Sequence, residues 1–416
     1  MPTLLILLLT AACRPIQAPN LPFGAAALPP GVASALAQLP IAQRAAASVE
    51  AATAESPFVT LYPALRQAPA PAWLRAGTRV TYRVGAATFA DPRLPRTDRN
   101  TPNPTPSGEG LLQYDVVAQT RGNLVFVSSA LNTQIPGQPP SLLSYGVGLP
   151  GAGEFWFSPL VLETAETAAS EVFQVQRMPL TIEGVDYTVV RMQTNTEVRV
   201  GTWDPRDPRP GQGEEVWAFD TATGILVFYR QALFWPDGSQ RSGITMSLLG
   251  QRRVQFPWRG GSVPDWVRPR VTLTFQGSQA LDIGIPPLVP LSVQLNARIT
   301  RVNTLWSEHT LQTIMSGDEI ANSAGATGVM QLFSGLWLPP EALAGLEAGA
   351  VLDYDRLTQI ETRVERASSR QVVLAAEGPG HLTRLTYDGR DGRLTGIYQE
   401  AHTPTGTLYT NLVGAP

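Results

Sequence analysis

The sequence predicts an all-β protein made of two related antiparallel lobes, because three observations agree. Apolar and polar residues alternate strictly from Leu291 to Thr300, a pattern typical of a strand with one buried and one solvent-facing side. Turn sequences such as Pro236-Asp237-Gly238 separate segments of this kind. Several short motifs also recur in the same order in the two halves of the chain. Helical periodicity beyond residue 73 is confined to a short turn expected at 340–346.

Composition excludes several classes of protein. The 416-residue chain has a formal net charge of −3, so it lacks the basic surplus of a nucleic-acid-binding protein. Its single cysteine rules out an intrachain disulfide and a cysteine-ligated zinc or iron–sulfur site. All 31 basic residues are arginine, which removes Schiff-base and P-loop lysine chemistry. Gly and Pro make up about 18% of the residues, which is loop-rich but below the range of disordered chains.

The amino terminus predicts secretion and a lipid anchor. The apolar run 4–9 is too short to span a bilayer but suits the apolar region of a signal peptide, and it is followed by small residues and Cys13. This arrangement resembles the bacterial lipoprotein signal, which implies that Cys13 is lipidated after removal of residues 1–12. Thr10 and the lack of a basic residue before the apolar run depart from that pattern. Arg14 after the cysteine implies the outer membrane. The alternative is an ordinary secretory signal.

Residues 13–72 predict a lipid-anchored tether rich in Ala and Pro. The segment 31–56 consists mostly of helix-forming residues and is broken by Pro40, so we expect a loose helix. The alternating Ala and Pro of 68–72 read as a stiff spacer. We expect this region to hold the globular part away from a membrane; the alternative is a helix that docks on the body.

The remaining chain is expected to form lobe 1 (residues 73–257) and lobe 2 (residues 264–416), joined by a Pro- and Gly-rich linker. PAWLR at 71–75 recurs as PDWVR at 264–268, and FDTATGIL at 219–226 recurs as YDGRDGRL at 387–394. SLLG at 247–250 is paired with NLVG at 411–414, and a rival register pairs 74–82 with 346–354. In the aromatic-Asp-x-x-x-Gly-x-Leu unit, Asp caps a tight turn and Gly supplies a positive φ. Expected strands lie at 79–88, 112–118, 124–130, 187–194, 215–219, 225–234, 271–281, 291–300, 311–315, 351–364, 371–375, 394–401 and 407–412.

A meander of long antiparallel strands with such hairpins, on a lipoprotein, is similar to the LolA/LppX-type lipid-binding lipoprotein fold. The resemblance implies strongly curved sheets, or half-barrels, that wrap an apolar cavity holding lipid or acyl chains. It rests on architecture and one hairpin motif, so it transfers no binding residue to this chain.

Candidate site residues are few. His309, His381 and His402 have no metal-type spacing, and we expect no metal or cofactor. Asp353 and Asp355 are two apart in an expected strand, so both carboxylates fall on one face, where they could share a proton or bind calcium. A solvated strand face is the alternative. The long loops 91–110, 136–153 and 202–215 are the other candidate binding regions, and we expect most tryptophans in the core: Trp156, Trp217, Trp235, Trp306 and Trp337.

These features favour a non-enzymatic cell-envelope lipoprotein that binds a lipid-like, apolar or amphiphilic ligand in a curved sheet. Expected partners are the membrane, through the lipid on Cys13, the ligand, and an envelope protein; nucleic acid is not expected. The alternatives are a structural or protein-interaction module of the envelope, and a glycan hydrolase using Asp353 and Asp355 as a carboxylate pair. A transmembrane β-barrel remains a further alternative.

Overall fold

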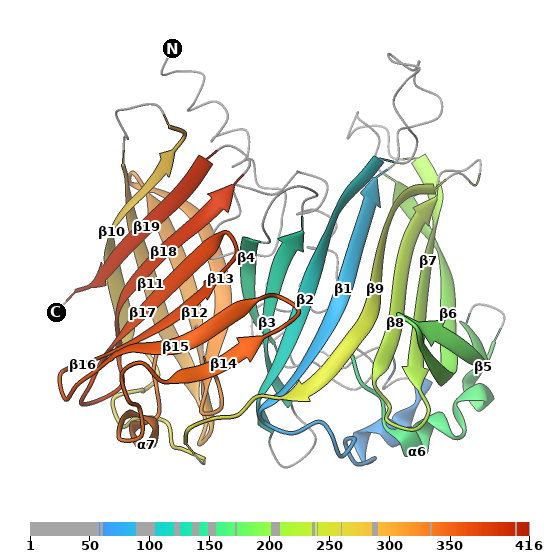
Figure 1. Ribbon diagram of the computed structural model, residues 1–416. Helices are drawn as coiled ribbons and strands as arrows, with labels where there is room; N and C mark the ends of the chain where they lie inside the picture. Colours follow the sequence, from blue (N-terminus) through green and yellow to red (C-terminus); the bar gives the residue numbers. More distant parts are fainter. Residues whose placement is uncertain are drawn as a thin grey trace.

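The computed structural model shows two open antiparallel sheets, so the all-β, two-lobe prediction is confirmed (Figure 1). Among the described residues, no helix is long and apolar enough to span a bilayer. The structure describes residues 58, 61–88, 105–119, 125–134, 141–148, 155–170, 173–200, 209–234, 238, 240–258, 260–284, 290–332, 335–403 and 406–415.

Lobe 1 contains a nine-stranded sheet in the order β4-β3-β2-β1-β9-β8-β7-β6-β5. The connection from β4 to β5 runs from one edge of the sheet to the other and carries the short helices α6 and η3. Its elements are η2 (Pro63–Arg66), β1 (Thr78–Thr88), β2 (Thr105–Gln119), β3 (Val125–Gln134), β4 (Ser141–Gly148), α6 (Pro159–Leu162), η3 (Ala165–Ala168), β5 (Phe173–Ile182), β6 (Val185–Val200), β7 (Arg209–Asp220), β8 (Leu226–Phe234) and β9 (Gln240–Arg253).

Lobe 2 contains a ten-stranded sheet in the order β13-β12-β11-β10-β19-β18-β17-β16-β15-β14. The order matches that of lobe 1 except that β14 is added at one edge. Its elements are β10 (Thr272–Asp282), β11 (Leu291–Val302), β12 (Trp306–Met315), β13 (Asp318–Gly328), α7 (Pro340–Leu343), β14 (Val351–Asp355), β15 (Ile360–Ala367), β16 (Gln371–Gly378), β17 (His381–Asp388), β18 (Leu394–Thr403) and β19 (Gly406–Gly414).

Some strands differ from the expected ones. The single strand expected at 351–364 is two strands, β14 and β15, joined by a tight turn in which Gln359 has a φ of 56°. No Gly or Pro marks this turn in the sequence. Strands β4, β9 and β17 were not among the expected strands, and neither were β5, which contains Pro179, and β13, which is rich in small residues. Strands β5 and β13 lie at sheet edges, where a Pro without an N–H and weak alternation are tolerated.

The recurring tryptophans occupy equivalent places in the two lobes. The indole Nε1 of Trp73 donates to the backbone oxygen of Thr223 at 2.7 Å, in the turn between β7 and β8. Nε1 of Trp266 donates to the backbone oxygen of Asp391 at 2.9 Å, in the turn between β17 and β18. The rival register is not followed, because 74–82 leads into central β1 whereas 346–354 leads into edge strand β14.

The structure does not align SLLG at 247–250 with NLVG at 411–414 in the way that the sequence comparison does. Tyr229 and Ile397 each follow their turn glycine by five residues. Tyr229 lies opposite Met246 on β9, whereas Ile397 lies opposite Leu412 on β19. Leu412 therefore corresponds to Met246 and not to Leu248, so the pairing of 247–250 with 411–414 is two residues out of register.

Gly224 and Gly392 have positive φ values of 69° and 71°, in the turn that each tryptophan contacts. A Cβ at Gly224 would overlap the backbone oxygen of Phe157, and one at Gly392 would overlap that of Leu338. These close approaches let the edge-to-edge connection hydrogen-bond to the turn, with Phe157 N donating to Gly224 O at 2.7 Å and Leu338 N donating to Gly392 O at 2.9 Å.

Substituting Gly224 with alanine is therefore expected to destabilise lobe 1 by about 2 kcal/mol more than the matched variant Gly184→Ala. Gly184 also has a positive φ, of 79°, but its Cβ would meet nothing within 4 Å. Urea unfolding of both variants measures the difference. Equal losses would show that the backbone conformation alone, and not the contact with Phe157, requires glycine at position 224.

Lobe 1 has a packed aromatic core. Phe155, Trp156 and Phe157 of the edge-to-edge connection are at most 1% exposed. Phe58 lies edge-to-face on Trp217 with ring centroids 5.1 Å apart. Tyr62 Oη donates to the backbone oxygen of Ala165 at 3.0 Å. The carboxyl-terminal end of the predicted tether therefore packs into the lobe 1 core, as the alternative of a segment docked on the body expects. Residues 1–57 lie outside the described residues.

The two lobes face each other in a defined way. Strand β4 of lobe 1 lies against both β13 and β18 of lobe 2. These two strands are separated in their own sheet by β12, β11, β10 and β19. Strand β4 therefore lies where the two ends of this curved stretch of sheet come near each other, beside β13 (Figure 1).

Candidate functional site

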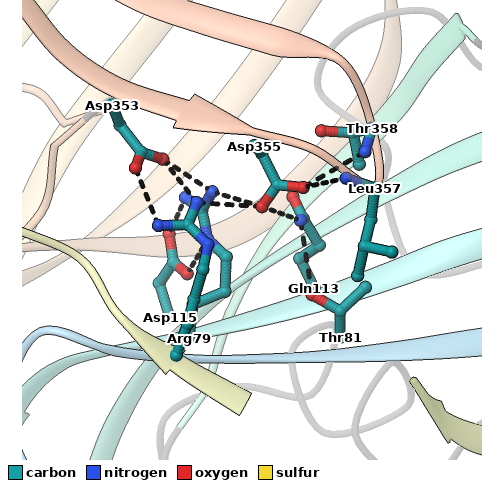
Figure 2. A network of polar contacts seen from close by, with 9 residues as sticks. Arg79, Thr81, Gln113, Asp115, Asp353, Asp355, Leu357 and Thr358 are labelled. Atoms are coloured by element: carbon teal, nitrogen blue, oxygen red, sulfur yellow. Dashed lines mark hydrogen bonds and ion pairs between the residues drawn. The ribbon is translucent and has the colours of Figure 1, made fainter. Parts of the chain in front are cut away.

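Asp353 and Asp355 lie on β14, a strand without a counterpart among the described residues of lobe 1. Figure 2 shows both carboxylates directed toward the strands of lobe 1. Opposite them are Arg79 on β1 and Arg252 on β9, which are cross-strand partners and hence neighbours on one face of that sheet. The two carboxylates lie on the same face of β14, as their spacing predicts, and that face contacts lobe 1.

Asp353 is bound by both arginines. Arg252 holds it in a fork, with Nη1 donating to Oδ1 at 2.8 Å and Nη2 donating to Oδ2 at 2.7 Å. Nη1 of Arg79 donates to Oδ2 at 2.9 Å. Forked pairs of this kind are the strongest and most directional ion pairs in proteins.

Asp355 accepts five hydrogen bonds (Figure 2). Its Oδ2 accepts hydrogen bonds from Nη1 of Arg79 at 3.1 Å, from Nη2 of Arg252 at 2.9 Å and from the side-chain amide of Gln113 at 2.8 Å. Its Oδ1 receives the backbone N–H groups of Leu357 and Thr358, which closes the turn between β14 and β15. One carboxylate therefore both shapes the turn and joins the lobes.

Arg79 is the central cation of this inter-lobe network. Its Nε and Nη2 bind Asp115 on β2 at 2.6 and 2.7 Å, while its Nη1 reaches across to β14. Its side chain is 11% exposed, and that of Asp355 is 3% exposed. Three carboxylates and two guanidiniums make the formal charge of the network −1.

Burial and ion pairing act in opposite directions on these groups. For Asp355, burial raises the pKa, but Arg79 and Arg252 outweigh it and hold the pKa well below its usual range. For Arg79, burial lowers the pKa, but Asp115, Asp353 and Asp355 hold it above its usual range. Asp355 and Arg79 are therefore both ionised at neutral pH.

This geometry assigns the carboxylates to an interface between lobes. The oxygens of Asp353 and Asp355 are taken up by donors, and within the described part of the chain no group of three His, Cys, Asp or Glu residues is arranged to hold a metal ion. Sequence reasoning missed Arg79, Arg252 and Gln113, because no local pattern links them to residues more than 100 positions away.

The inner face of lobe 2 presents a second cluster. Strand register aligns an apolar row across β15 to β19: Val364, Leu374, Leu385, Ile397 and Leu412. The adjoining polar row on the same face is Thr362, Ala376, Thr383, Gln399, Thr410 and, on β10, Gln279. Gln279 donates to Thr410 Oγ1 at 3.0 Å. Apolar and polar rows side by side give this face an amphipathic character.

Three side chains in or near the polar row lack partners. Thr383 Oγ1, Thr358 Oγ1 and both ring nitrogens of His381 are buried without a hydrogen bond. These residues are 3%, 1% and 6% exposed. Burial lowers the pKa of His381 to about 4, although Glu377 acts in the opposite direction. We call Thr358, His381 and Thr383 the unpartnered cluster.

The other candidates have separate positions. His309 is buried elsewhere in lobe 2, and burial lowers its pKa to about 3, whereas His402 is exposed. Trp156, Trp217, Trp306 and Trp337 are core residues, as predicted. The loop prediction is wrong for the described parts of 91–110, 136–153 and 202–215, which are strands: 105–110 belong to β2, 141–148 form β4 and 209–215 belong to β7. Cys13, Trp235 and the rest of those three segments lie outside the described residues.

No family model and no curated protein matches the sequence. Among solved structures, a DUF3598-family protein of unknown function from Nostoc punctiforme aligns with 82% of this chain and 97% of its own, at 10% identity and a TM-score of 0.14. A variant of transferrin binding protein B from Haemophilus parasuis aligns with 82% of this chain and 77% of its own, at 6% identity and a TM-score of 0.14. A putative AttH from Nitrosomonas europaea aligns with 81% of this chain and 92% of its own, at 11% identity and a TM-score of 0.13. Such TM-scores carry no argument about function.

Proposed function

We propose that the chain is a non-enzymatic lipoprotein of the cell envelope that binds an amphiphilic ligand against the inner face of lobe 2. The observation that carries ligand binding is the unpartnered cluster beside the apolar row, because buried polar groups in folded proteins normally have partners. The anchor on Cys13, an extracytoplasmic location and the outer membrane rest on the sequence alone.

Lobe 2 is favoured over lobe 1 as the binding lobe. The interior of lobe 1 is occupied by large aromatic side chains that contact one another, including Phe157, Phe219 and Trp217. Lobe 2 has a packed core of its own, which includes Phe275, Trp337 and the apolar row, but beside that core lie buried hydroxyl and imidazole groups that the chain itself does not satisfy. A ligand with hydrogen-bonding groups would satisfy them.

A structural or protein-interaction module is the second candidate, and the inter-lobe network favours it. Arg79 and Arg252 hold the lobes in one fixed arrangement, as a scaffold requires. A carboxylate-based hydrolase finds no such support. A general acid must carry its proton near neutral pH, whereas Asp355 has a depressed pKa and both carboxylates are bound by guanidiniums.

Native mass spectrometry of the full chain, extracted from a diderm bacterial host in mild detergent, tests the proposal. We expect a covalent acyl mass that disappears in Cys13→Ala, and a separate non-covalent ligand that is released on activation and persists in that variant. The absence of acyl mass from the wild type would refute the lipoprotein assignment. Absence of any non-covalent ligand, together with no uptake of added lipid, would leave the scaffold as the function.

A further inference from the structure

Exposed arginines gather at the end of lobe 2 where β10 begins and β11 ends. We call them the arginine patch, which consists of Arg268, Arg270, Arg298 and Arg301. Arg298 lies opposite Thr272 at the start of β10. The backbone N–H of Arg270 donates to the backbone oxygen of Ile299 at 2.8 Å, which places Arg270 beside β11 between Arg298 and Arg301.

A β-bulge turns Arg301 toward the same face of the sheet as Arg298. Strict alternation would place two residues that are three positions apart on opposite faces. The register between β11 and β12 shifts after the core residue Ile299, which lies opposite His309. The neighbour of His309, Glu308, points to the other face and lies opposite Arg301. Arg298 and Arg301 therefore share the outer face, and bulges that redirect a side chain in this way are common beside functional sites.

The patch carries positive charge that the chain does not balance, although the whole chain has a net charge of −3. Within the described residues its one ion pair joins Arg301 to Glu308, with 4.0 Å between Nη1 and Oε1. Arg268 Nε donates to the backbone oxygen of Asp265 at 2.9 Å, so the carboxylate of Asp265 is also nearby. Four guanidiniums against these two carboxylates leave a formal charge of +2.

The arginine patch lies at the end of the molecule where the chain enters lobe 1. Strands β1 and β10 point in the same direction in Figure 1, so both begin at the same end. The described chain also starts at this end, with Phe58 and η2 (blue in Figure 1). The predicted tether from Cys13 therefore joins lobe 1 on the side of the molecule that carries the patch.

We infer that the arginine patch binds the phosphate groups of an anionic lipid surface and so orients the two lobes on the membrane. The inference rests on the proposed anchoring at Cys13 and adds the face of the protein that meets the membrane. Guanidinium groups pair well with phosphate oxygens. Each arginine close to an anionic membrane strengthens binding about fivefold, whereas a zwitterionic surface offers the patch no net charge.

Sedimentation of the full chain with lipid vesicles tests this inference, with Cys13→Ala in every protein so that no acyl chain contributes. At about 50 mM NaCl the parent should bind vesicles with about 30% phosphatidylglycerol at least about fiftyfold more tightly than pure phosphatidylcholine vesicles, and about 0.5 M NaCl should abolish this preference. Arg298→Gln with Arg301→Gln, and separately Arg268→Gln with Arg270→Gln, should each weaken binding to the anionic vesicles about 25-fold. Binding to phosphatidylcholine should not change.

Arg363→Gln with Arg384→Gln is the matched control, because it removes the same charge from two partly exposed arginines of lobe 2 that bind glutamates. It should bind anionic vesicles within about threefold of the parent. An equal loss in control and patch variants would show that only net charge matters and would overturn the inference, as would equal binding of the parent to both vesicles. Release by about 10 mM inorganic phosphate at constant ionic strength would instead indicate a site for free phosphate. None of these results would alter the acyl mass at Cys13, which tests the lipoprotein assignment separately.

Discussion

Replacing Arg79 with methionine is expected to lower the free energy of unfolding by about 3–5 kcal/mol. Arg79 contacts three carboxylates, and its removal leaves Asp115, Asp353 and Asp355 with Arg252 as the remaining cation of the network. Methionine keeps the length of the side chain, so the loss reports the missing charge and donors. Urea unfolding at pH 7, followed by tryptophan fluorescence, measures the change.

Arg363→Met provides the control for this prediction. Arg363 also binds two carboxylates, Glu361 and Glu377, but it lies on an exposed part of β15 where the three side chains are 34–50% exposed. Ion pairs screened by solvent contribute about 1 kcal/mol or less. If the two arginine variants lost the same stability, the inter-lobe network would be no more than a set of surface pairs, and β14 would not fasten the lobes.

The sequence anticipated those features that depend on local patterns. Strict alternation at 291–300 became β11, and the Asp–Gly hairpin units became turns with glycine at positive φ. The two-residue spacing of Asp353 and Asp355 correctly placed both on one face. Their function as interface residues depends on Arg79, 274 residues away from Asp353, and strand alternation carries no information about such a distant partner.

The difference between the lobes explains where the interface lies. Duplicated sheets share the tryptophan-to-turn contact and the close approach at the turn glycine, and these are features of each lobe's own stability. In the part of the chain that the structure describes, β14 has no equivalent in lobe 1, and it carries Asp353 and Asp355, the carboxylates that reach across the interface. An insertion of this kind can join two copies of a sheet without altering the core of either. The unpartnered cluster lies close to the same turn.

Acidification from pH 7 to pH 5 is expected to destabilise the protein by about 4 kcal/mol, about 2 kcal/mol from each of two buried histidines. Burial lowers the pKa of His309 to about 3 and that of His381 to about 4 in the folded protein. The unfolded chain takes up these protons near pH 6.5, so the stability is complete above that value and declines as pH falls toward the folded pKa values. Asp355 acts in a separate window, because its stabilising contribution is lost only below about pH 4.

Urea unfolding at pH 5, 6 and 7 measures this dependence, and single variants divide it between the two rings. His381→Leu and His309→Leu should each remove about half of the loss between pH 7 and pH 5. His402→Gln, at a histidine whose side chain is 52% exposed, should leave the profile unchanged. A leucine variant that kept the full pH dependence would mean that its histidine is protonated in the folded protein at pH 5.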